Sequence, residues 1–465
     1  MLNEGADQEK RKYFRIQPNH LAPNGAPYSR DAVKRQKLDR QKEQATKDYG
    51  QRIAKERIRK AKSLAHPLSG VNREAGIMNT SNNMTLRRNG EAYASQLQRK
   101  ELHSFSPLGD GIPISHFVRH PVTGALYTST CWEGKAAVAV CYPEPEMARS
   151  EWIYNSSKER AVWRDSYRIS SLSISVNNWL LSTMDDGPTG KSKLMIARLP
   201  EPCEDGIHRQ FSTYSPGITF ESRPTTIWSS SASPPGSTAR FAIGTSKGLY
   251  TLTSGGLDWS LAKVGFPHSN GPREKPRSEN YSANQVLTVE WLTQDLIGCG
   301  LRDSSIFFYD YRCNGLATRL QHPHAVEKIR ALDSWRLIAA GHHWLRMYDL
   351  RYPINGVQSR PIPNDPQHTS TTPYMTFPAY TASGKLDADF DISQELGLLA
   401  TCSPDRNIQL FSLSDGSLVS SPASKYHYPD PVSGVRFEHG EYPALGLQTP
   451  RLLVGSGPTV QEWAW

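Results

Sequence analysis

From about residue 112 onward, the chain consists of short apolar runs separated by clusters of Ser, Gly, Asn, Asp and Pro. This pattern is typical of many short antiparallel strands. Five segments share one design, in which an apolar run ends in a small residue and a polar turn leads into a second apolar run. They are RFAIGTSKGLYTL from Arg240, DLIGCGLRDSSIFFYD from Asp295, RLIAAGHHWLRMYDL from Arg336, LLATCSPDRNIQLFSL from Leu398 and RLLVGSGPTVQEWAW from Arg451.

The spacing of these segments indicates an internal repeat. Their equivalent small residues are separated by 56, 41, 61 and 53 positions, and they are Gly244, Gly300, Gly341, Cys402 and Gly455. A unit of about 40 to 45 residues with loops of variable length explains such spacings. Two weaker copies come earlier, GALYTSTCWEGKAAVAVCY from Gly124 and WLLSTMDDGPTGKSKLMIARL from Trp179. Seven units then fill residues 112–465.

Two of the repeats end their second apolar run in the same way. IFFYDYR at 306–312 and LRMYDLR at 345–351 share an Asp-x-Arg ending, and Asp310 and Asp349 lie 39 residues apart. Both aspartates stand where WD40 repeats end their third strand, although Tyr309 and Tyr348 occupy the place of the usual tryptophan. The domain at 112–465 therefore resembles an all-β, divergent seven-bladed WD40-type β-propeller. A strand from one terminus usually completes such a ring, and we expect residues 112–118 to supply it.

The first hundred residues have a different character. They carry 22 Lys and Arg against 10 Asp and Glu, a net charge of +12, so the basic balance of the whole chain comes from this region. Residues 1–28 mix aromatic and basic groups with Pro and Gly, which indicates an extended segment. Residues 29–64 predict a basic helix with Ser29 as its N-cap. Residues 65–111 predict a flexible linker.

The predicted helix has too few apolar positions to bury a stripe in a core. It is therefore suited to docking on another molecule, or it is a solvated charged helix without a partner. Its sequence KERIRKAK at 55–62 also fits a nuclear import signal, with a solvated helix face as the alternative.

Motifs for catalysis are weak. Gly244, Ser246 and Gly248 match G-x-S-x-G, but a nucleophile elbow needs a helix after the serine, and here a strand follows. The glycine pair at 298 and 300 is better explained by a tight hairpin than by dinucleotide binding. The neighbouring histidines His322, His324, His342 and His343 are expected to be surface or packing residues. We therefore predict a non-enzyme with no cofactor and no metal.

The six cysteines are scattered without CxxC spacing, and the N-terminus lacks a signal-peptide pattern. We therefore expect a reducing compartment, the nucleus or the cytoplasm. No run of roughly 18 apolar residues occurs, so we expect no membrane span.

The Asp-x-Arg endings carry the candidate chemistry. Residues i and i+2 of a strand point to the same side, so Asp310 with Arg312, and Asp349 with Arg351, should project together from adjacent blades. An arginine held by a neighbouring aspartate is oriented to donate to carbonyls or carboxylates of a partner. The alternative is that both pairs tie blade ends together through surface salt bridges, which contribute little energy.

A family resemblance bears on that choice. The double Asp-x-Arg ending after a basic helical segment resembles the WD-repeat substrate receptors of cullin-4 RING ubiquitin ligases. KYFRIQPNH at 12–20, the Lys/Arg/Gln helix after it, IFFYDYRCNGLATRLQH at 306–322 and NIQLFSLSDGSLV at 407–419 are similar to the cullin-4-associated factor 4 group, also called WD repeat protein 21.

The resemblance covers most of the chain and implies a non-catalytic substrate receptor. Arg312 and Arg351 would lie on the narrow face of the propeller against the triple-propeller adaptor, and through it the protein would join cullin-4. The helical segment would enter a cleft of the adaptor, and the opposite face and pore would be left for a protein substrate, which the sequence does not identify.

The competing hypothesis is a WD-repeat scaffold in RNA or ribosome assembly. It follows from the +12 charge of the first hundred residues, since phosphate binding needs clustered Lys and Arg. The tail lacks RGG repeats or interleaved aromatic residues for base stacking, which disfavours RNA.

Overall fold

The computed structural model divides the chain into two compact units, Met1–Asn82 and Asn83–Trp465. It describes residues 4–7, 12–15, 29–56, 82–102, 111–120, 124–141, 143–146, 151–154, 160–185, 191–199, 218–220, 225–236, 238–255, 258–264, 285–313, 315–351, 371–381, 389–442 and 447–464.

The first unit contains a hairpin and a long helix. Strand β1 (Glu4–Asp7) pairs antiparallel with β2 (Lys12–Arg15). Helix α1 (Arg30–Glu56) begins where the sequence predicts, because the Ser29 hydroxyl accepts the Ala32 N–H at 3.3 Å and so caps the first turn. Its 27 residues span about 40 Å at 1.5 Å per residue. Residues 57–64 of the predicted helix lie outside the described part.

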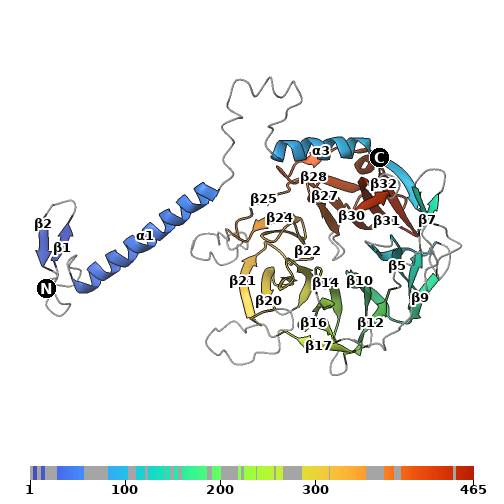
Figure 1. Cartoon of the computed structure of the whole chain (residues 1–465), viewed down its shortest axis with the longest axis horizontal. Coiled ribbons are helices and arrows are strands. Elements are labelled where there is room, and N and C mark those ends of the chain that lie inside the picture. The colour runs from blue at the N-terminus through green and yellow to red at the C-terminus, as the bar shows by residue number, and fades with distance from the viewer. Residues whose placement is uncertain are drawn as a thin grey trace, which may run out of the picture. The chain divides into compact units, whose positions relative to one another are not determined.

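The second unit is a ring of seven four-stranded antiparallel sheets, here called blades 1 to 7 (Figure 1). Blade 1 consists of β4 (Ile114–Arg119), β5 (Leu126–Trp132), β6 (Lys135–Cys141) and β9 (Arg160–Asp165), and blade 2 consists of β10 (Arg168–Ser175), β11 (Trp179–Asp185), β12 (Ser192–Arg198) and β13 (Ile218–Thr219). Blade 3 consists of β14 (Ile227–Ala232), β15 (Arg240–Thr245), β16 (Gly248–Ser254) and β17 (Trp259–Lys263). Blade 4 consists of β18 (Val286–Trp291), β19 (Leu296–Leu301), β20 (Ser305–Asp310) and β21 (Gly315–Gln321).

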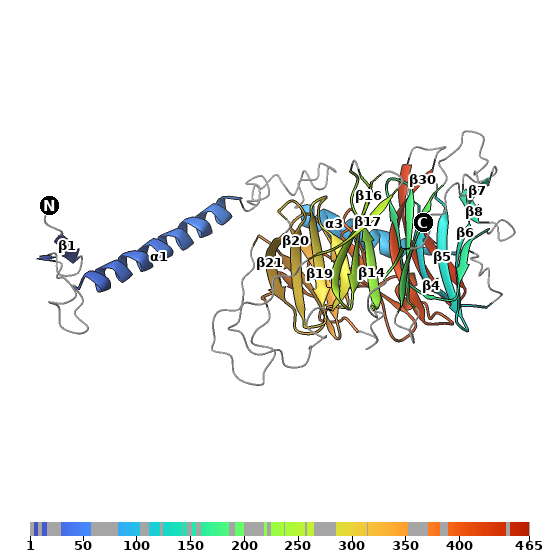
Figure 2. The same ribbon diagram turned by 90° about the horizontal axis from the view of Figure 1, so that it is seen from below.

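Blade 5 consists of β22 (Lys328–Ala331), β23 (Arg336–Gly341), β24 (Trp344–Asp349) and β25 (Met375–Thr376). Blade 6 consists of β26 (Phe390–Ser393), β27 (Leu398–Cys402), β28 (Ile408–Ser412) and β29 (Leu418–Val419). Blade 7 consists of β30 (Val432–Tyr442), β31 (Leu447–Ser456), β32 (Thr459–Ala464) and β3 (Gln98–Leu102). The remaining elements are the hairpin β7 (Pro143–Glu146) and β8 (Glu151–Tyr154), helix α3 (Asn82–Gln96) and the short helix α4 (Pro422–Lys425). Figure 2 shows the blades edge-on.

The structure confirms the seven-bladed propeller and the register of the repeats. All five small residues used to align the repeats lie in the second strand of their blade. At two of the glycines a side chain would collide with the next blade, since a Cβ on Gly300 would come within 2.5 Å of Val326 and one on Gly244 within 2.8 Å of the Val286 carbonyl. A Cβ on Gly341 would instead meet the Ala325 carbonyl just before its own blade. The small residues of the repeat therefore answer a demand for close packing at these points.

The ring closes through the N-terminal strand β3, which pairs antiparallel with β32 from Gln98 opposite Ala464 to Leu102 opposite Val460. Closure by a strand from the other end of the domain was predicted, but its position at 112–118 was wrong. Those residues overlap β4, the first strand of blade 1, which pairs with β5. The sequence QRKEL of β3 is mostly charged, as suits an edge strand, and so lacks an apolar run.

The predicted flexible linker at 65–111 is also wrong over residues 82–102. Helix α3 lies along the outside of the ring beside β28 and β32 (Figure 1). Tyr93, Ala94 and Leu97 lie on one side of the helix and at its end, and they are buried in the core shared by blades 6 and 7. At its other end Arg87 pairs with Asp415 at 2.6 Å. The segment is therefore part of the propeller.

The buried end of α3 generates a stability prediction. Leu97→Ala removes a fully packed side chain from the core that joins blades 6 and 7, and should lower the free energy of unfolding by about 3 kcal/mol, measured by urea denaturation. Arg88→Ala, on the exposed side of the same helix, is the control and should change it by less than about 0.5 kcal/mol. Equal stabilities of the two variants would show that α3 does not support the ring.

Candidate functional site

The Asp-x-Arg endings form two matching turns at the ends of β20 and β24. Asp310 Oδ1 accepts the Arg312 backbone N–H at 2.9 Å, and Asp349 Oδ1 accepts the Arg351 N–H at 3.0 Å. Such a bond from an aspartate to the backbone two residues later shapes the turn locally. The equivalent turn of blade 6 uses Ser412, whose hydroxyl accepts the Ser414 N–H at 3.3 Å. The aspartates thus have a structural role of their own.

Each aspartate also holds the guanidinium of its arginine. Arg312 donates from Nε at 3.2 Å and from Nη2 at 2.9 Å to the two carboxylate oxygens of Asp310. Arg351 makes the same pair of bonds to Asp349 at 3.0 and 2.6 Å. The hydrogen bonds from the Arg312 side chain and backbone hold the pKa of the Asp310 carboxyl at about 2. Both carboxylates therefore orient their arginines through two parallel bonds.

The two arginines are presented to solvent while their aspartates lie beneath them. The Arg312 side chain is 72% exposed and that of Arg351 is 49% exposed, against 15% for Asp310 and 3% for Asp349. The bonds to aspartate use the Nε–Nη2 edge of each guanidinium, so the opposite edge faces away from the carboxylate. Ion pairs this close to solvent contribute about 0 to 1 kcal/mol, so their main effect is on orientation.

Both turns lie at the same end of adjacent blades, where the first strand turns into the second and the third into the fourth. The Tyr311 N–H donates to the Asp295 carbonyl at 2.7 Å, and the Leu350 N–H donates to the Trp335 carbonyl at 2.7 Å. We call the surface formed by Arg312, Trp335 and Arg351 the arginine face. The two ion pairs lie within single turns.

The G-x-S-x-G match lies in a hairpin, as predicted. Ser246 sits between β15 and β16, where its hydroxyl accepts the Thr226 N–H at 3.0 Å and its own N–H donates to the Thr226 carbonyl at 2.9 Å. No helix follows it in this described stretch. Gly298 and Gly300 lie within strand β19 rather than in the hairpin turn itself, where close packing between blades explains at least Gly300.

The histidines fall into two groups. His322 is buried, and its Nδ1 lies 2.9 Å from the Tyr348 hydroxyl, which links the loop before blade 5 to the third strand of that blade. This contact gives the tyrosine at the usual tryptophan position a structural role. The rings of His324, His342 and His343 lie next to one another at the opposite end of the blades from the arginine face, with centroids 5.1 and 3.9 Å apart. Within the described residues, no group of three or more His, Cys, Asp or Glu is arranged to hold a metal.

Sequence reasoning missed an ion-pair network, which we call the ionic belt. It lies mainly on the innermost strands and includes Arg451 of β31 and Glu462 of β32. Lys328 and Arg330 alternate on β22, and Asp389 and Asp391 alternate immediately before and within β26. The links are Arg330 to Glu290 at 3.2 Å and to Asp391 at 3.5 Å, Asp389 to Lys328 at 3.0 Å and to Arg436 at 2.6 Å, Arg119 to Glu438 at 3.0 Å and to Glu462 at 3.5 Å, and Arg451 to Glu462 at 2.7 Å.

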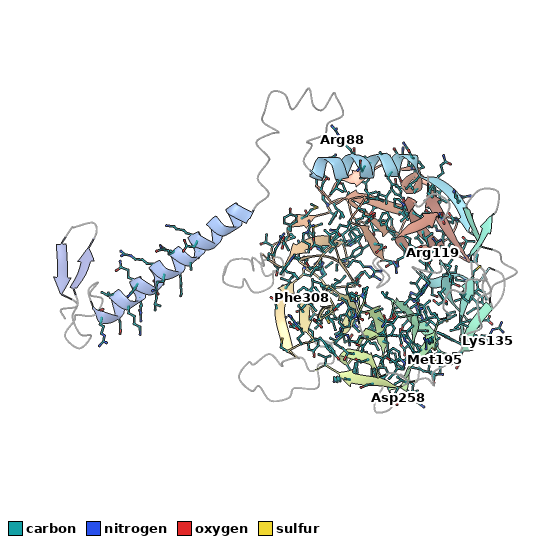
Figure 3. The ribbon with its side chains drawn as sticks, in the orientation of Figure 1. Arg88, Arg119, Lys135, Met195, Asp258 and Phe308 are labelled. Carbon is teal, nitrogen blue, oxygen red and sulfur yellow. The ribbon has the colours of Figure 1, made fainter. Side chains whose placement is uncertain are left out.

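The belt joins blade 4 to blade 1 through blades 5, 6 and 7. Figure 3 shows Arg119 on the inner side of the ring, whereas Lys135 lies at its outer margin. Burial lowers the pKa of Lys328 and raises that of Glu290, while the nearby Arg436 and Lys328 hold the pKa of Asp389 below its usual range despite its burial. On blades 2 and 3 the innermost strands carry hydroxyls in place of charges, with Ser171 and Ser230 2.7 Å apart. The belt stabilises contacts between blades.

Two other expectations concern compartment and membrane. The described cysteines are free thiols: Cys131, Cys141, Cys299, Cys313 and Cys402. None of the described helices is long and apolar enough to cross a membrane.

Comparison with solved structures supports the propeller type. The chain is similar to the β-propeller domain of Cps50 (Swd1) from Myceliophteria thermophila, at 12% identity and a TM-score of 0.50, covering 80% of this chain and 99% of that one. It is also similar to the WD40 β-propeller domain of Doa1, at 11% identity and a TM-score of 0.50, covering 79% and 97%. The fold is a WD40-type β-propeller. No protein-family model and no curated protein matches the sequence.

The buried histidine of blade 5 generates a pH prediction. Burial lowers the pKa of His322 to about 3, below the value of about 6.5 for an unfolded histidine. Between these two pKa values the unfolded chain binds a proton at His322 and the folded chain does not. The free energy of unfolding therefore falls as the pH drops from about 6.5 toward 3.

His322→Gln removes the one proton that this histidine takes up on unfolding. Below about pH 6.5, the slope of the free energy of unfolding against pH should therefore fall by about 1.4 kcal/mol per pH unit. Urea unfolding at a series of pH values between 7 and 4.5 measures it. His343→Gln, which removes an exposed histidine of the same blade, should keep the wild-type slope. A slope in His322→Gln equal to that of the wild type would contradict the assignment.

Proposed function

We propose that the protein is a non-catalytic substrate receptor of a cullin-4 RING ubiquitin ligase, which docks on the triple-propeller adaptor through Arg312 and Arg351. One observation carries the proposal: two solvent-exposed arginines, each held by an aspartate two residues earlier, lie in matching turns at the same end of adjacent blades. The resemblance of the Asp-x-Arg endings and of the basic helix to the cullin-4 receptor family also supports the proposal.

The geometry of the arginines fits a protein partner. A guanidinium oriented by a carboxylate loses less conformational entropy on binding than a mobile one, and its planar edge can donate two parallel bonds to a carboxylate or to backbone carbonyls. The turns lie on a rigid ring, so the two arginines keep a fixed separation. More coarsely, the protein acts as an interaction scaffold whose partners are proteins.

The ligase role would require no catalytic residue in this chain. The propeller would hold a target close to the ligase's conjugating enzyme and so raise the effective concentration of the target's lysines. Helix α1 would contribute to docking by entering the adaptor cleft, as the resemblance implies. The proposal places the protein in the nucleus or the cytoplasm.

The exposed basic helix keeps RNA or ribosome assembly as a second candidate. Helix α1 carries nine Lys and Arg against five Asp and Glu, and its described side chains are mostly exposed. Clustered positive charge of this kind attracts phosphates.

The first prediction of the ligase hypothesis concerns the arginine pair. Arg312→Ala with Arg351→Ala should weaken binding to the purified adaptor by at least about 100-fold, because bonds between charged groups contribute about 1.5 to 3 kcal/mol each. Arg312→Lys with Arg351→Lys keeps the charge and loses the planar fork, so binding should fall to an intermediate level. Isothermal titration calorimetry measures the affinities.

The matched control removes two arginines elsewhere on the propeller. Arg88 is exposed on α3, and Arg302 is exposed in the β19–β20 hairpin at the opposite end of blade 4. Arg88→Ala with Arg302→Ala should bind the adaptor as the wild type does. Unchanged binding by the Arg312/Arg351 variant, with its propeller intact by circular dichroism, would refute the docking hypothesis.

Salt dependence separates the two candidate functions. If α1 binds RNA, the affinity for a single-stranded RNA should fall steeply between about 50 and 200 mM salt, by a factor of about 300 for six phosphate contacts. Adaptor binding should change far less and should depend on the two arginines. Fluorescence anisotropy with labelled RNA and with labelled adaptor, at the same series of salt concentrations, makes the comparison. Tight, salt-sensitive RNA binding without adaptor binding would favour the RNA role.

A further inference from the structure

The tip of the turn between β22 and β23 carries a tryptophan at a position that the fold fills elsewhere with small or polar residues. In five blades, a backbone N–H at or just after the end of the third strand donates to the carbonyl of this position, with N···O distances of 2.7 to 3.0 Å. The carbonyls belong to Asn178, Ala239, Asp295, Trp335 and Gly397.

The residues at this turn position in the other blades show which side chains the fold tolerates there. Asn178 and Gly397 take a positive φ of 59° and 63°, so the turns comparable to that of Trp335 are those of Ala239 and Asp295. In these turns a small or short polar residue supplies the same carbonyl, so the hydrogen bond does not require a large side chain. Trp335 leaves 55% of its side chain exposed, so its ring is not there to fill a core. A single exposed apolar residue is normal on a protein surface. What distinguishes Trp335 is the structure around it.

The turn that carries Trp335 is held rigidly. Asp333 Oδ1 accepts the backbone N–H groups of Trp335 at 2.8 Å and Arg336 at 2.7 Å, while Asp333 Oδ2 pairs with the Arg336 guanidinium at 2.7 Å. These bonds hold the pKa of the Asp333 carboxyl below its usual range despite its partial burial. A ring on a rigid turn loses little freedom when a partner covers it.

Trp335 also lies at the same end of the blades as the two oriented arginines. Its carbonyl accepts the Leu350 N–H, and Leu350 precedes Arg351 in the chain. Arg312 holds the corresponding place in the turn of blade 4, next along the ring. Tryptophan and arginine are the residue types most enriched at the energetic centres of protein interfaces.

We infer that Trp335 is the apolar anchor of the arginine face, and that it enters an apolar slot bordered by carboxylates on the adaptor. The inference rests on the proposed function and names the chemistry of the partner surface: the slot takes the indole, and the flanking carboxylates take Arg312 and Arg351.

Charge argues for this occupant over a nucleic acid or a second copy. Around the two turns, Arg240, Arg312, Arg336 and Arg351 are balanced by four carboxylates, those of Asp295, Asp310, Asp333 and Asp349. Among these described groups there is no excess of positive charge to attract a polyanion over a distance. In a symmetric dimer, the arginines of one copy would face those of the other. A protein surface with a few well-placed carboxylates meets neither difficulty.

The test is Trp335→Ala, titrated against the purified adaptor by calorimetry. Loss of a buried indole anchor should weaken binding by about 30-fold or more. Because alanine and aspartate occupy this position in blades 3 and 4 without a positive φ, Trp335→Ala and Trp335→Asn should both fold, with melting temperatures close to that of the wild type. Trp132→Ala is the matched control. Trp132 is 52% exposed at the β5–β6 hairpin, at the opposite end of the blades, and its loss should leave binding unchanged.

A second readout reports on the ring directly. In protein labelled with 5-fluorotryptophan, the fluorine resonance assigned to Trp335 should shift on addition of the adaptor, and that of Trp132 should stay in place. The possible outcomes separate the inference from the proposed function. If the arginine variants lose binding while Trp335→Ala binds as tightly as the wild type, the inference fails and the docking function stands. If wild-type protein does not bind the adaptor at all, the proposed function fails, and the inference fails with it.

Discussion

The propeller depends on the pairing of β3 with β32. An open row of seven sheets would expose a flat edge at each end, and its first and last blades would each lack a neighbour. Five residue pairs between Gln98–Leu102 and Val460–Ala464 close the row into a ring. Once the ring is closed, the position of each turn relative to the others is fixed, so Arg312, Trp335 and Arg351 can act together as one surface.

Two further constraints hold the blades in the closed ring. Small residues in the second strands let the next blade approach closely, as at Gly244 and Gly300. On the innermost strands of five blades, the ionic belt places acids and bases opposite one another. Buried charges are costly unless they are paired, so the belt disfavours any register that would separate them. Packing and electrostatics therefore specify the same neighbours.

The repeated blades could be predicted from the sequence, but most features that occur only once in the ring could not. Seven blades followed from repeated pairs of apolar runs, five of which have a small residue at the end of the first run. The closing segment 82–102 escaped notice because β3 is mostly charged and α3 has few apolar positions. The ionic belt could not be predicted, since most of its partners lie in different blades. For the candidate site, the sequence predicted that Asp310 and Arg312 would project together from one strand, but Arg312 lies in the turn after β20, and a backbone bond within that turn brings the two together. The relation of Trp335 to its counterparts in other blades needed the hydrogen-bond register.

The closing strand also has a consequence for the order of synthesis. On the ribosome, β3 emerges before any other strand of the propeller, and its partner β32 emerges after all the other described strands. Throughout translation the nascent chain therefore holds an unpaired strand that must neither aggregate nor pair with an early blade. Arg99, Lys100 and Glu101 make this strand a poor partner for other sheet edges. The charged residues that make β3 hard to recognise in the sequence thus disfavour its aggregation and mispairing until β32 is made.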